Sequence, residues 1–526
     1  MKIRIPLFLI FLFFATNLFS QNPNFHIYLC FGQSNMEGQG TIQAQDRACD
    51  SRFKVMQALD CPNLHREKGV WYTATPPLCQ CHSKLSPADY FGRTMIANLP
   101  DSITVGVINV AVGGCDIRLF DKDIYMDYDS TYAESWFTSK VEAYGWNPYQ
   151  HLIDLAIKAQ QDGVIKGILL HQGETNTGQS QWTSYVQKIY TDMLTDLSLD
   201  AESVPILAGE VLSVKPNCCA SMNTIINKLP ELVETAYIIS SANCEGLPDA
   251  AHFNSEGYRL LGRRYAVQML SLMGYEAYYM EPECGVVGEN WRIFSDISAS
   301  QKAYVTPHGE LTHDVNPPTN TADMITMNVT LAADTTYFVY GRFNNASSTE
   351  SDAVWIKIND EAFQRVDNLI TIGWEWKELI QANLSAGTHT ITIAYVKKGL
   401  MLDKLVIKNS NISPVDVGEE AKEECTPEFS VGFDMLQNNA GYYLGQSFPN
   451  PCYDSTVIPF TLPKSEFVSI SVFDLQGVEL FECVAKEFPA GENSVSCNVA
   501  TLPSGTYVYR LKTNSYSLQK QFVIKK

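Results

Sequence analysis

The sequence predicts an α/β domain built on a parallel sheet, followed by two all-β domains. Three observations lead to this prediction. Residues 25–274 alternate short apolar runs with longer segments of helical spacing. After Gly274, helical spacing becomes scarce and short alternating strands take its place. An acidic segment poor in apolar residues, 411–438, then divides the β-rich region in two. Because the chain has 526 residues, more than one domain is expected.

Five strand-like runs and the helical segments between them predict the first domain. The runs are FHIYLCF, ITVGVINVAV, GVIKGILLH, VPILAGEVL and TAYIISS, and the helical segments include PYQHLIDLAIKAQQ and WTSYVQKIYTDMLTDL. Alternating strands and helices predict a parallel sheet covered on both faces. Functional sites of such sheets gather at the carboxyl ends of the strands, so the residues directly after each strand are the first candidates for a site.

The start of the chain resembles a secretory signal peptide over residues 1–20. Lys2 and Arg4 precede the short apolar run IPLFLIFLFFATNLF. An uncleaved membrane anchor is the alternative. No other stretch reaches about 18 apolar residues, so no transmembrane segment is expected in the mature chain.

Charge and cysteine content narrow the function classes. The formal net charge of -20 disfavours a nucleic-acid partner, because phosphate would be repelled. The 14 cysteines of an exported chain suggest disulfides. Pairing among Cys49, Cys61, Cys79 and Cys81 is expected, with a metal site at residues 79–82 as the alternative. Cys483 and Cys497 flank a hairpin-like segment and form a further candidate pair.

Ser34 follows the first apolar run directly, in the stretch GQSNM. If a helix begins there, its free N–H groups face a reaction site and can stabilise an oxyanion. A serine that merely caps a helix is the alternative. The elbow G-x-S-x-G is absent because Met36 occupies the position of the second glycine.

Asp249 and His252 follow the last predicted strand of this domain, three residues apart. At the start of a helix this spacing lets the carboxylate hold one imidazole nitrogen and leaves the other free to take a proton from a serine. Stabilisation of a helix dipole by Asp249 is the alternative.

Two more strands end in polar or glycine-rich segments. HQGETN follows GVIKGILL, and there Gln172 is a candidate oxyanion donor and Glu174 a candidate partner of a histidine or of substrate. Gly113 and Gly114 follow ITVGVINVAV, where glycine lets backbone N–H groups approach a ligand closely. A tight turn is the alternative for the two glycines.

GQSNM, the Gly-Gly turn, HQGETN and the late DxxH together resemble the blocks of the SGNH hydrolase superfamily. GQSNM with HQGE resembles its carbohydrate esterase family 6 branch, which includes acetyl xylan esterases and sialate O-acetylesterase-like proteins. The resemblance covers about 250 residues. It implies a three-layer α/β/α domain and a serine acyl-transfer mechanism that needs no cofactor.

The resemblance also implies residue roles. Ser34 is the expected nucleophile, His252 the general base and Asp249 its partner, with Glu174 as the competing acid. The backbone N–H groups of Ser34 and Gly114 and the side chain of Gln172 are the expected oxyanion donors. This sequence has Gln172 where the superfamily usually supplies asparagine.

The leading functional hypothesis is a secreted deacetylase acting on acetylated polysaccharide, with xylan as the substrate. A sialate O-acetylesterase is the alternative within the enzymes, and a non-catalytic carbohydrate-binding surface protein the alternative outside them. Trp136 and Trp146 are expected either to touch sugar or to be buried.

Residues 278–410 contain the runs MITMNVTL, TYFVYGRF, AVWIKIN, HTITIAYV and LDKLVIKN, which predict an antiparallel β-sandwich. Glu281 and Glu283 near its start and Asp403 near its end resemble a carbohydrate-binding module of the family 6 and 35 type. That resemblance implies a structural calcium. Trp374 and Trp376 lie on one side of a strand and are either a sugar platform or core residues.

Residues 439–526 contain FPNP, FTLP, VFDLQG, LPSGTYVYRL and KQFVIKK. These pieces resemble the C-terminal sorting domain of type IX secretion in the Bacteroidetes. The resemblance implies the secretion machinery as a partner, and surface attachment or release as the outcome. A purely structural β-domain is the alternative.

Overall fold

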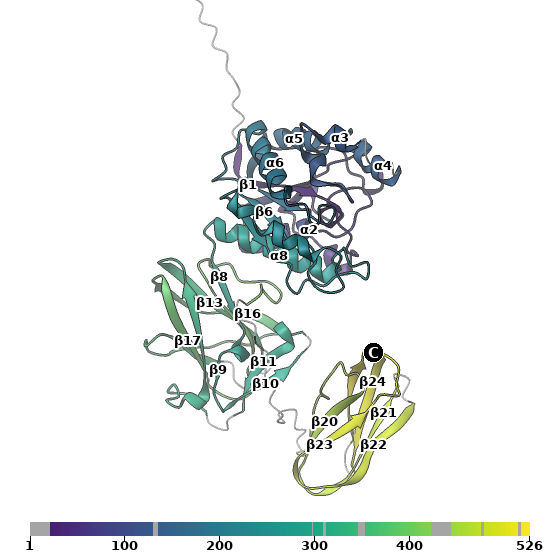
Figure 1. Cartoon of the computed structure of the whole chain (residues 1–526). Coiled ribbons are helices and arrows are strands. Elements are labelled where there is room, and N and C mark those ends of the chain that lie inside the picture. The colour runs from purple at the N-terminus through teal and green to yellow at the C-terminus, as the bar shows by residue number, and fades with distance from the viewer. Residues whose placement is uncertain are drawn as a thin grey trace, which may run out of the picture.

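The computed structural model describes residues 21–129, 135–296, 298–308, 312–345, 353–421, 425, 443–474, 478–513 and 517–526. The expected signal peptide, 1–20, lies outside the described residues, as does most of the expected linker beyond 421. Figure 1 shows three bodies in chain order, the first purple to teal, the second green and the third yellow. None of the helices described is long and apolar enough to cross a membrane.

A seven-stranded sheet forms the centre of the N-terminal domain, in the order β3-β2-β4-β1-β5-β6-β7. Its strands are β1 (Asn22–Gly32), β2 (Phe53–Met56), β3 (Trp71–Thr73), β4 (Thr104–Ala111), β5 (Gly163–His171), β6 (Ile206–Gly209) and β7 (Ala236–Ile239). Neighbouring strands run parallel except β2 and β3, which are antiparallel. The predicted α/β fold is confirmed, and the antiparallel edge strand is an addition to it.

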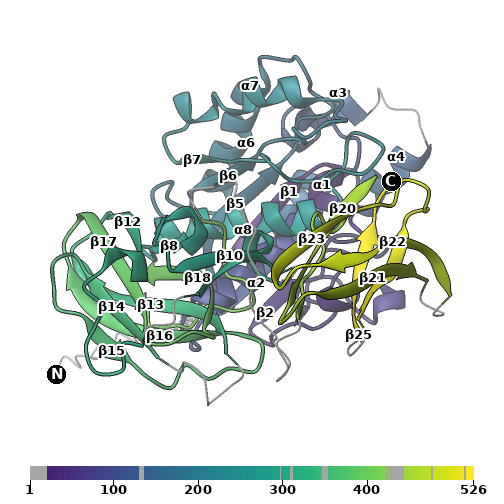
Figure 2. The same cartoon turned by 90° about the horizontal axis from the view of Figure 1, so that it is seen from below.

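Helices cover both faces of this sheet. They are α1 (Ser34–Glu37), α2 (Pro87–Asn98), α3 (Tyr125–Asp129), α4 (Ser135–Ala143), α5 (Pro148–Ala159), α6 (Trp182–Asp196), α7 (Asn223–Ile226) and α8 (Ser255–Leu272). Along β1, Ile27, Leu29 and Phe31 join the core shared with α5 and α6, while Tyr28 and Cys30 join the core shared with α2 and α8. This alternation gives three layers, which Figure 2 shows with α6 on one side of β5 and β6 and α2 with α8 on the other.

The middle domain is a β-sandwich of two antiparallel sheets around one core. One sheet has the order β10-β11-β18-β13-β16, with β8 paired to β18, and the other β15-β14-β17-β12-β9. The strands are β8 (Ala277–Met280), β9 (Val286–Val287), β10 (Trp291–Ser295), β11 (Ala303–Pro307), β12 (Met324–Leu331), β13 (Thr335–Asn344), β14 (Val354–Ile358), β15 (Gln364–Val366), β16 (Trp374–Leu384), β17 (Gly387–Tyr395) and β18 (Met401–Lys408). All five runs that predicted this sandwich are strands of it.

The segment that follows the sandwich packs against the first two domains. Arg264 of α8 forms a two-bond ion pair with Glu420, at 2.7 and 2.9 Å. The Trp376 Nε1–H donates to the carbonyl of Asp416 at 3.1 Å. The described part of the expected linker, 411–421, is therefore packed chain rather than a free spacer.

The C-terminal domain is a second sandwich, with sheets in the order β19-β20-β23 and β22-β21-β24-β25. Its strands are β19 (Tyr443–Leu444), β20 (Ser455–Leu462), β21 (Glu466–Phe473), β22 (Glu479–Phe488), β23 (Gly491–Asn498), β24 (Gly505–Lys512) and β25 (Ser517–Ile524). A core of alternate residues from both sheets fills the space between them, as a half-buried strand pattern predicts.

Four disulfides join cysteines of the described chain. They are Cys61–Cys81, Cys218–Cys219, Cys284–Cys425 and Cys483–Cys497. The first lies within the set expected to pair and the last joins the pair expected across the hairpin. Because Cys81 is bonded to Cys61 and Cys79 is a buried free thiol, residues 79–82 do not form the alternative metal site.

Candidate active site

Ser34 stands at the junction between β1 and α1. Gly32 ends β1 with φ at 147°, and a Cβ there would lie 2.0 Å from the carbonyl oxygen of His171. Only glycine therefore fits where β1 passes the end of β5. The Gln33 N–H donates to the same carbonyl at 3.0 Å, which fixes the turn. The turn places Ser34 at the first position of α1, at the carboxyl end of the sheet.

A chain of hydrogen bonds joins Ser34, His252 and Asp249. Ser34 Oγ lies 2.8 Å from His252 Nε2, and His252 Nδ1 lies 2.8 Å from Asp249 Oδ2. Asp249 Oδ1 also accepts the N–H groups of Ala251 and His252, each at 3.0 Å. One carboxylate thus holds both the turn and the imidazole. This geometry can pass a proton from a serine to a histidine.

The electrostatics of Asp249 suit that arrangement. Burial raises the pKa of its carboxyl, but the hydrogen bonds from the His252 side chain and from the backbone N–H groups outweigh it and leave the pKa below its ordinary value. Asp249 is therefore an ionised acceptor at neutral pH. The turn is held from behind by α8, which begins where the Asn254 side chain accepts the Gly257 N–H at 2.9 Å.

Glu174, the competing acid, contacts a different group. Its Oε1 accepts from Asn35 Nδ2 at 2.5 Å, and Asn35 Nδ2 also donates to the carbonyl of Ala251 at 3.0 Å. Glu174 therefore reaches the histidine loop through Asn35, while Nδ1 of His252 is held by Asp249. The structure brings both acids to the site but gives only Asp249 a contact with the imidazole.

The expected oxyanion donors divide into two backbone groups and one side chain. A Cβ on Gly113 would lie 3.5 Å from Ser34 Cβ, so the Gly-Gly turn adjoins the serine. Gly114 has φ at 81°. The N–H groups of Ser34 and Gly114 donate to no other group of the described residues. Both can therefore donate to a new oxyanion beside Ser34 Oγ.

The expectation that Gln172 donates to the oxyanion is wrong. Its side chain is fully buried, and Nε2 donates to Gln33 Oε1 at 3.0 Å, the Cys115 carbonyl at 3.1 Å and Asn176 Oδ1 at 2.6 Å. Its Oε1 accepts from Trp182 Nε1 at 2.5 Å. These bonds use the donor capacity of the amide and leave none for substrate.

An ion pair that the sequence analysis missed supports the Gly-Gly turn. Glu37, in the last position of α1, accepts the Gly113 N–H at 2.7 Å and pairs with Lys140 Nζ at 2.6 and 2.8 Å. Only 5% of the Glu37 side chain is exposed. The carboxylate therefore ties α1, the Gly-Gly turn and α4 together. No sequence signal links Glu37 to Lys140, which lies 103 residues away.

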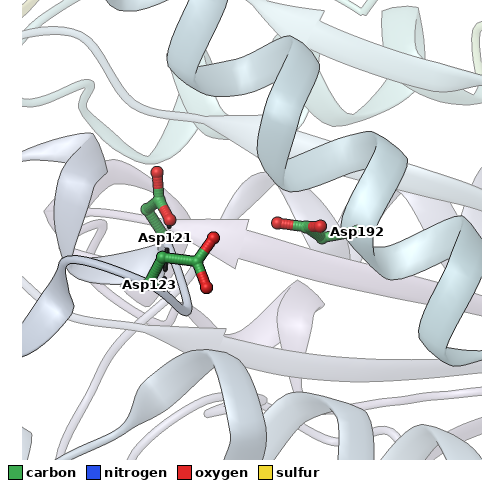
Figure 3. Close-up of side chains that lie close together, drawn as sticks. All are labelled: Asp121, Asp123 and Asp192. Atoms are coloured by element: carbon green, nitrogen blue, oxygen red, sulfur yellow. Dashed lines mark hydrogen bonds between the residues drawn. The ribbon is translucent and has the colours of Figure 1, made fainter.

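Figure 3 shows a group of three carboxylates in this domain, Asp121, Asp123 and Asp192. Ligand atoms of Asp121, Asp123 and Asp192 all lie within 4.8 Å of one another. The ammonium of Lys188 lies among them, at 2.8, 2.7 and 2.8 Å from the respective carboxylates. The chain's own cation thus takes the position that a metal ion would need.

The three acids expected to hold calcium in the middle domain are all buried. Glu281 Oε1 lies 3.1 Å from Lys404 Nζ, and Asp403 is paired with Arg342. Both oxygens of Glu283 and Oε2 of Glu281 have no hydrogen-bond partner among the described atoms. Two of the three carboxylates are thus partly neutralised by the chain, while Glu283 offers two buried unpaired oxygens.

Burial shifts the proton affinity of this acidic group. It raises the pKa of Glu283 to about 8, with the charge of Glu281 adding to the shift. It raises the pKa of Asp403 to about 6, despite the opposing hydrogen bond from Arg342. A divalent cation bonded to the free oxygens would offset the cost of burying these charges.

Trp374 and Trp376 both lie on β16, outside the main core of the sandwich. Trp376 packs edge-on against Tyr279 with ring centroids 6.1 Å apart, beneath the segment that follows the sandwich. Trp374 packs edge-on against Tyr304 with ring centroids 5.6 Å apart, lies beneath the Arg342 guanidinium and is partly exposed. Both rings are therefore partly exposed, and each indole N–H has an acceptor, Asp296 Oδ2 for Trp374 and the Asp416 carbonyl for Trp376.

Comparison with known proteins adds to this geometry. Residues 24–271 match the family model of carbohydrate esterase, sialic acid-specific acetylesterase, and residues 446–525 match that of the secretion system C-terminal sorting domain. Among solved structures, a protein from Arabidopsis thaliana is 18% identical with a TM-score of 0.37, and the match covers 48% of this chain and 99% of that one.

Two further matches cover the middle domain. A family 35 carbohydrate-binding module from Clostridium thermocellum is 21% identical, with a TM-score of 0.20, over 24% of this chain and 96% of that one. A GH26-CBM35 β-(1,4)-mannanase from Podospora anserina is 18% identical, with a TM-score of 0.21, over 26% of this chain and 28% of that one.

Proposed function

We propose that the chain, whose residues 24–271 match the carbohydrate esterase, sialic acid-specific acetylesterase family model, removes O-acetyl groups from a polysaccharide, and that this polysaccharide is acetylated xylan. The C-terminal sorting domain directs the protein to secretion and the cell surface, where a polymeric substrate is accessible. The observation that carries the proposal is the hydrogen-bonded series from Ser34 through His252 to Asp249.

In the proposed reaction, His252 Nε2 takes the hydroxyl proton of Ser34 as Oγ attacks the acetyl carbonyl. The backbone N–H groups of Ser34 and Gly114 stabilise the tetrahedral oxyanion. The sugar oxygen leaves with the proton that His252 returns. Water then hydrolyses the acetyl-enzyme by the same route and regenerates Ser34.

The charges around the site favour a neutral sugar over an anionic one. The cations described near the Gly-Gly turn are paired, Lys140 with Glu37 and Arg118 with Asp116 at 2.8 Å. The chain also carries a formal net charge of -20. A sialic acid carboxylate would therefore approach against a repulsive field, whereas a xylose ring would not.

Acetate release separates the candidate functions. Ser34→Ala is expected to lower acetate release from acetylated xylan by at least about 10³-fold, whereas an unchanged rate would remove Ser34 from the mechanism. Wild-type protein that releases acetate only from O-acetylated sialic acid would favour the sialate esterase. Wild-type protein that hydrolyses no acetyl ester and still binds xylan would favour the non-catalytic alternative.

A structural calcium in the middle domain remains a second proposal, supported by the free buried oxygens of Glu283 and Glu281. Those two residues and Asp403 would supply its ligands. Calcium is expected to raise the melting temperature of the wild type but not that of Glu283→Gln. The exposed acid Glu361 gives a control, since Glu361→Gln is expected to respond as the wild type does. An equal response from all three proteins would refute the site.

A further inference from the structure

We propose that Trp136 is the stacking surface for the sugar ring that carries the scissile acetyl group. This inference rests on the proposed function and names the part of the chain that holds the sugar in place. Trp136 lies at the start of α4, and its side chain is not part of the hydrogen-bonded series that moves the proton.

The position of Trp136 beside the reaction centre follows from two contacts. A Cβ built on Gly114 would lie 2.8 Å from Trp136 Cη2, so the indole edge rests on the backbone that offers the oxyanion N–H. A Cβ on the preceding Gly113 would lie 3.5 Å from Ser34 Cβ. The indole and the serine thus flank the same two-glycine turn.

Although Trp136 adjoins the site, 52% of it is exposed. Tryptophan is highly buried on average, and a half-exposed indole beside a candidate site is available for contact with a ligand. Its Nε1–H donates to no acceptor among the described residues. The residue therefore presents an apolar face and a free donor to solvent beside Ser34, which is the combination that suits the C–H face and hydroxyl groups of a sugar ring.

The rest of α4 holds this ring in place. Phe137 and Val141 are fully buried and join the core. Lys140 lies four residues after Trp136, on the same helix face, and its Nζ pairs with Glu37 at 2.6 Å. The ion pair therefore turns the Trp136 face of α4 toward α1. A fixed aromatic surface loses little conformational freedom when a sugar binds, which favours a binding role.

The neutral substrate proposed above is of the kind that an aromatic stacking surface would bind. Lys140, four residues after Trp136 on this face of α4, is already paired with Glu37. Recognition must then come from apolar contact and hydrogen bonds rather than from charge. A pyranose ring bearing an acetyl ester offers both, with the ester carbonyl over Ser34 and the ring over Trp136.

The test compares Trp136→Ala with wild type on two acetyl esters. Acetylated xylan has a sugar ring next to the ester, while ethyl acetate, followed by pH-stat, has none. The ratio of kcat/KM for xylan to that for ethyl acetate is expected to fall about tenfold in Trp136→Ala, mainly through KM. Trp136→Phe keeps a flat ring and is expected to stay within about threefold of the wild-type ratio.

Trp146→Ala is the matched control. Trp146 is 44% exposed and follows the C-terminal end of α4, about 10 Å along the helix axis from Trp136, so its loss is expected to leave the ratio as in the wild type. An equal loss on both esters in Trp136→Ala would overturn the inference, because Trp136 would then act on the Gly-Gly turn. An unchanged ratio in Trp136→Ala would overturn it as well. Wild-type protein that hydrolyses ethyl acetate but no acetylated saccharide would instead overturn the proposed function.

Discussion

Replacing Asp249 by asparagine tests which acid serves His252. The two oxygens of Asp249 have separate tasks, because Oδ1 accepts two backbone N–H groups and Oδ2 accepts from the imidazole. Asparagine keeps one oxygen, which the two N–H groups of the turn will retain. Its NH₂ group then faces His252 Nδ1 and can only donate. The imidazole must place its proton on Nε2, where it cannot accept the proton of Ser34.

The expected loss in kcat depends on how exposed the Asp249 side chain is. Loss of a deeply buried carboxylate partner lowers kcat by about 10⁴ in serine hydrolases. The Asp249 side chain is 48% exposed, so water can partly replace it. We therefore expect Asp249→Asn to lower kcat by about 10²–10³. Asp249→Ala leaves the tautomer free and should lose less activity, while the lost turn bonds should cost about 1 kcal/mol of stability.

The measurement is kcat for ethyl acetate at neutral pH, with thermal unfolding of each variant. Glu174→Gln is the control, because glutamine keeps an oxygen for Asn35 Nδ2, and a loss below about tenfold is expected. A larger loss in Glu174→Gln than in Asp249→Asn would refute the assignment of Asp249. An Asp249→Asn variant within about tenfold of wild type would refute the tautomer argument.

Four further substitutions test the scaffold. Lys140→Met leaves the Glu37 carboxylate buried without a cation, so the free energy of unfolding measured with denaturant should fall by about 2 kcal/mol. Glu37→Gln keeps an acceptor for the Gly113 N–H and should lower it by only about 1 kcal/mol. Gly32→Ala places a Cβ 2.0 Å from the His171 carbonyl oxygen, and we expect no folded protein by circular dichroism. Burial lowers the pKa of Lys408 from 10.5 to about 8, so wild-type stability rises with pH between those values. Lys408→Met should therefore raise the melting temperature at pH 7, and that gain should vanish above about pH 10.5.

The core of the fold was predictable because its strands are buried on both faces and its helices are long. β1, β4 and β5 each follow from a mainly apolar run, interrupted only by His26, Asn109 and Lys166 respectively within the runs FHIYLCF, VGVINVA and GVIKGILL. By contrast, β2 and α2 were missed. α2 contains Gly92, which weakens helical propensity, and a Cβ there would lie 1.9 Å from the ring of Phe53 in β2. The glycine is required by a contact between distant segments, so local pattern could not reveal the helix.

The parts of the candidate site that depend on a residue's position along the chain could be predicted from the sequence. Ser34 follows a strand, and the spacing of Asp249 and His252 places both on one turn. The parts of the candidate site that depend on the direction of a side chain could not be predicted. Gln172 follows β5 at the expected place, yet its amide points into the protein. Sequence position fixes which edge of the sheet a residue occupies, but neighbouring side chains decide whether it faces substrate.

The buried Gln172 amide still explains how the site is assembled. Its Nε2 contacts Gln33, which precedes Ser34, and the carbonyl of Cys115, which follows Gly114. One side chain after β5 therefore links the ends of β1 and β4. Because the proposed nucleophile Ser34 and the proposed oxyanion donor Gly114 follow those two ends, we expect the amide to set their separation without touching substrate. A hydrocarbon at this position would leave several buried polar groups unpaired, so polar chemistry is needed here for positioning rather than for the reaction itself.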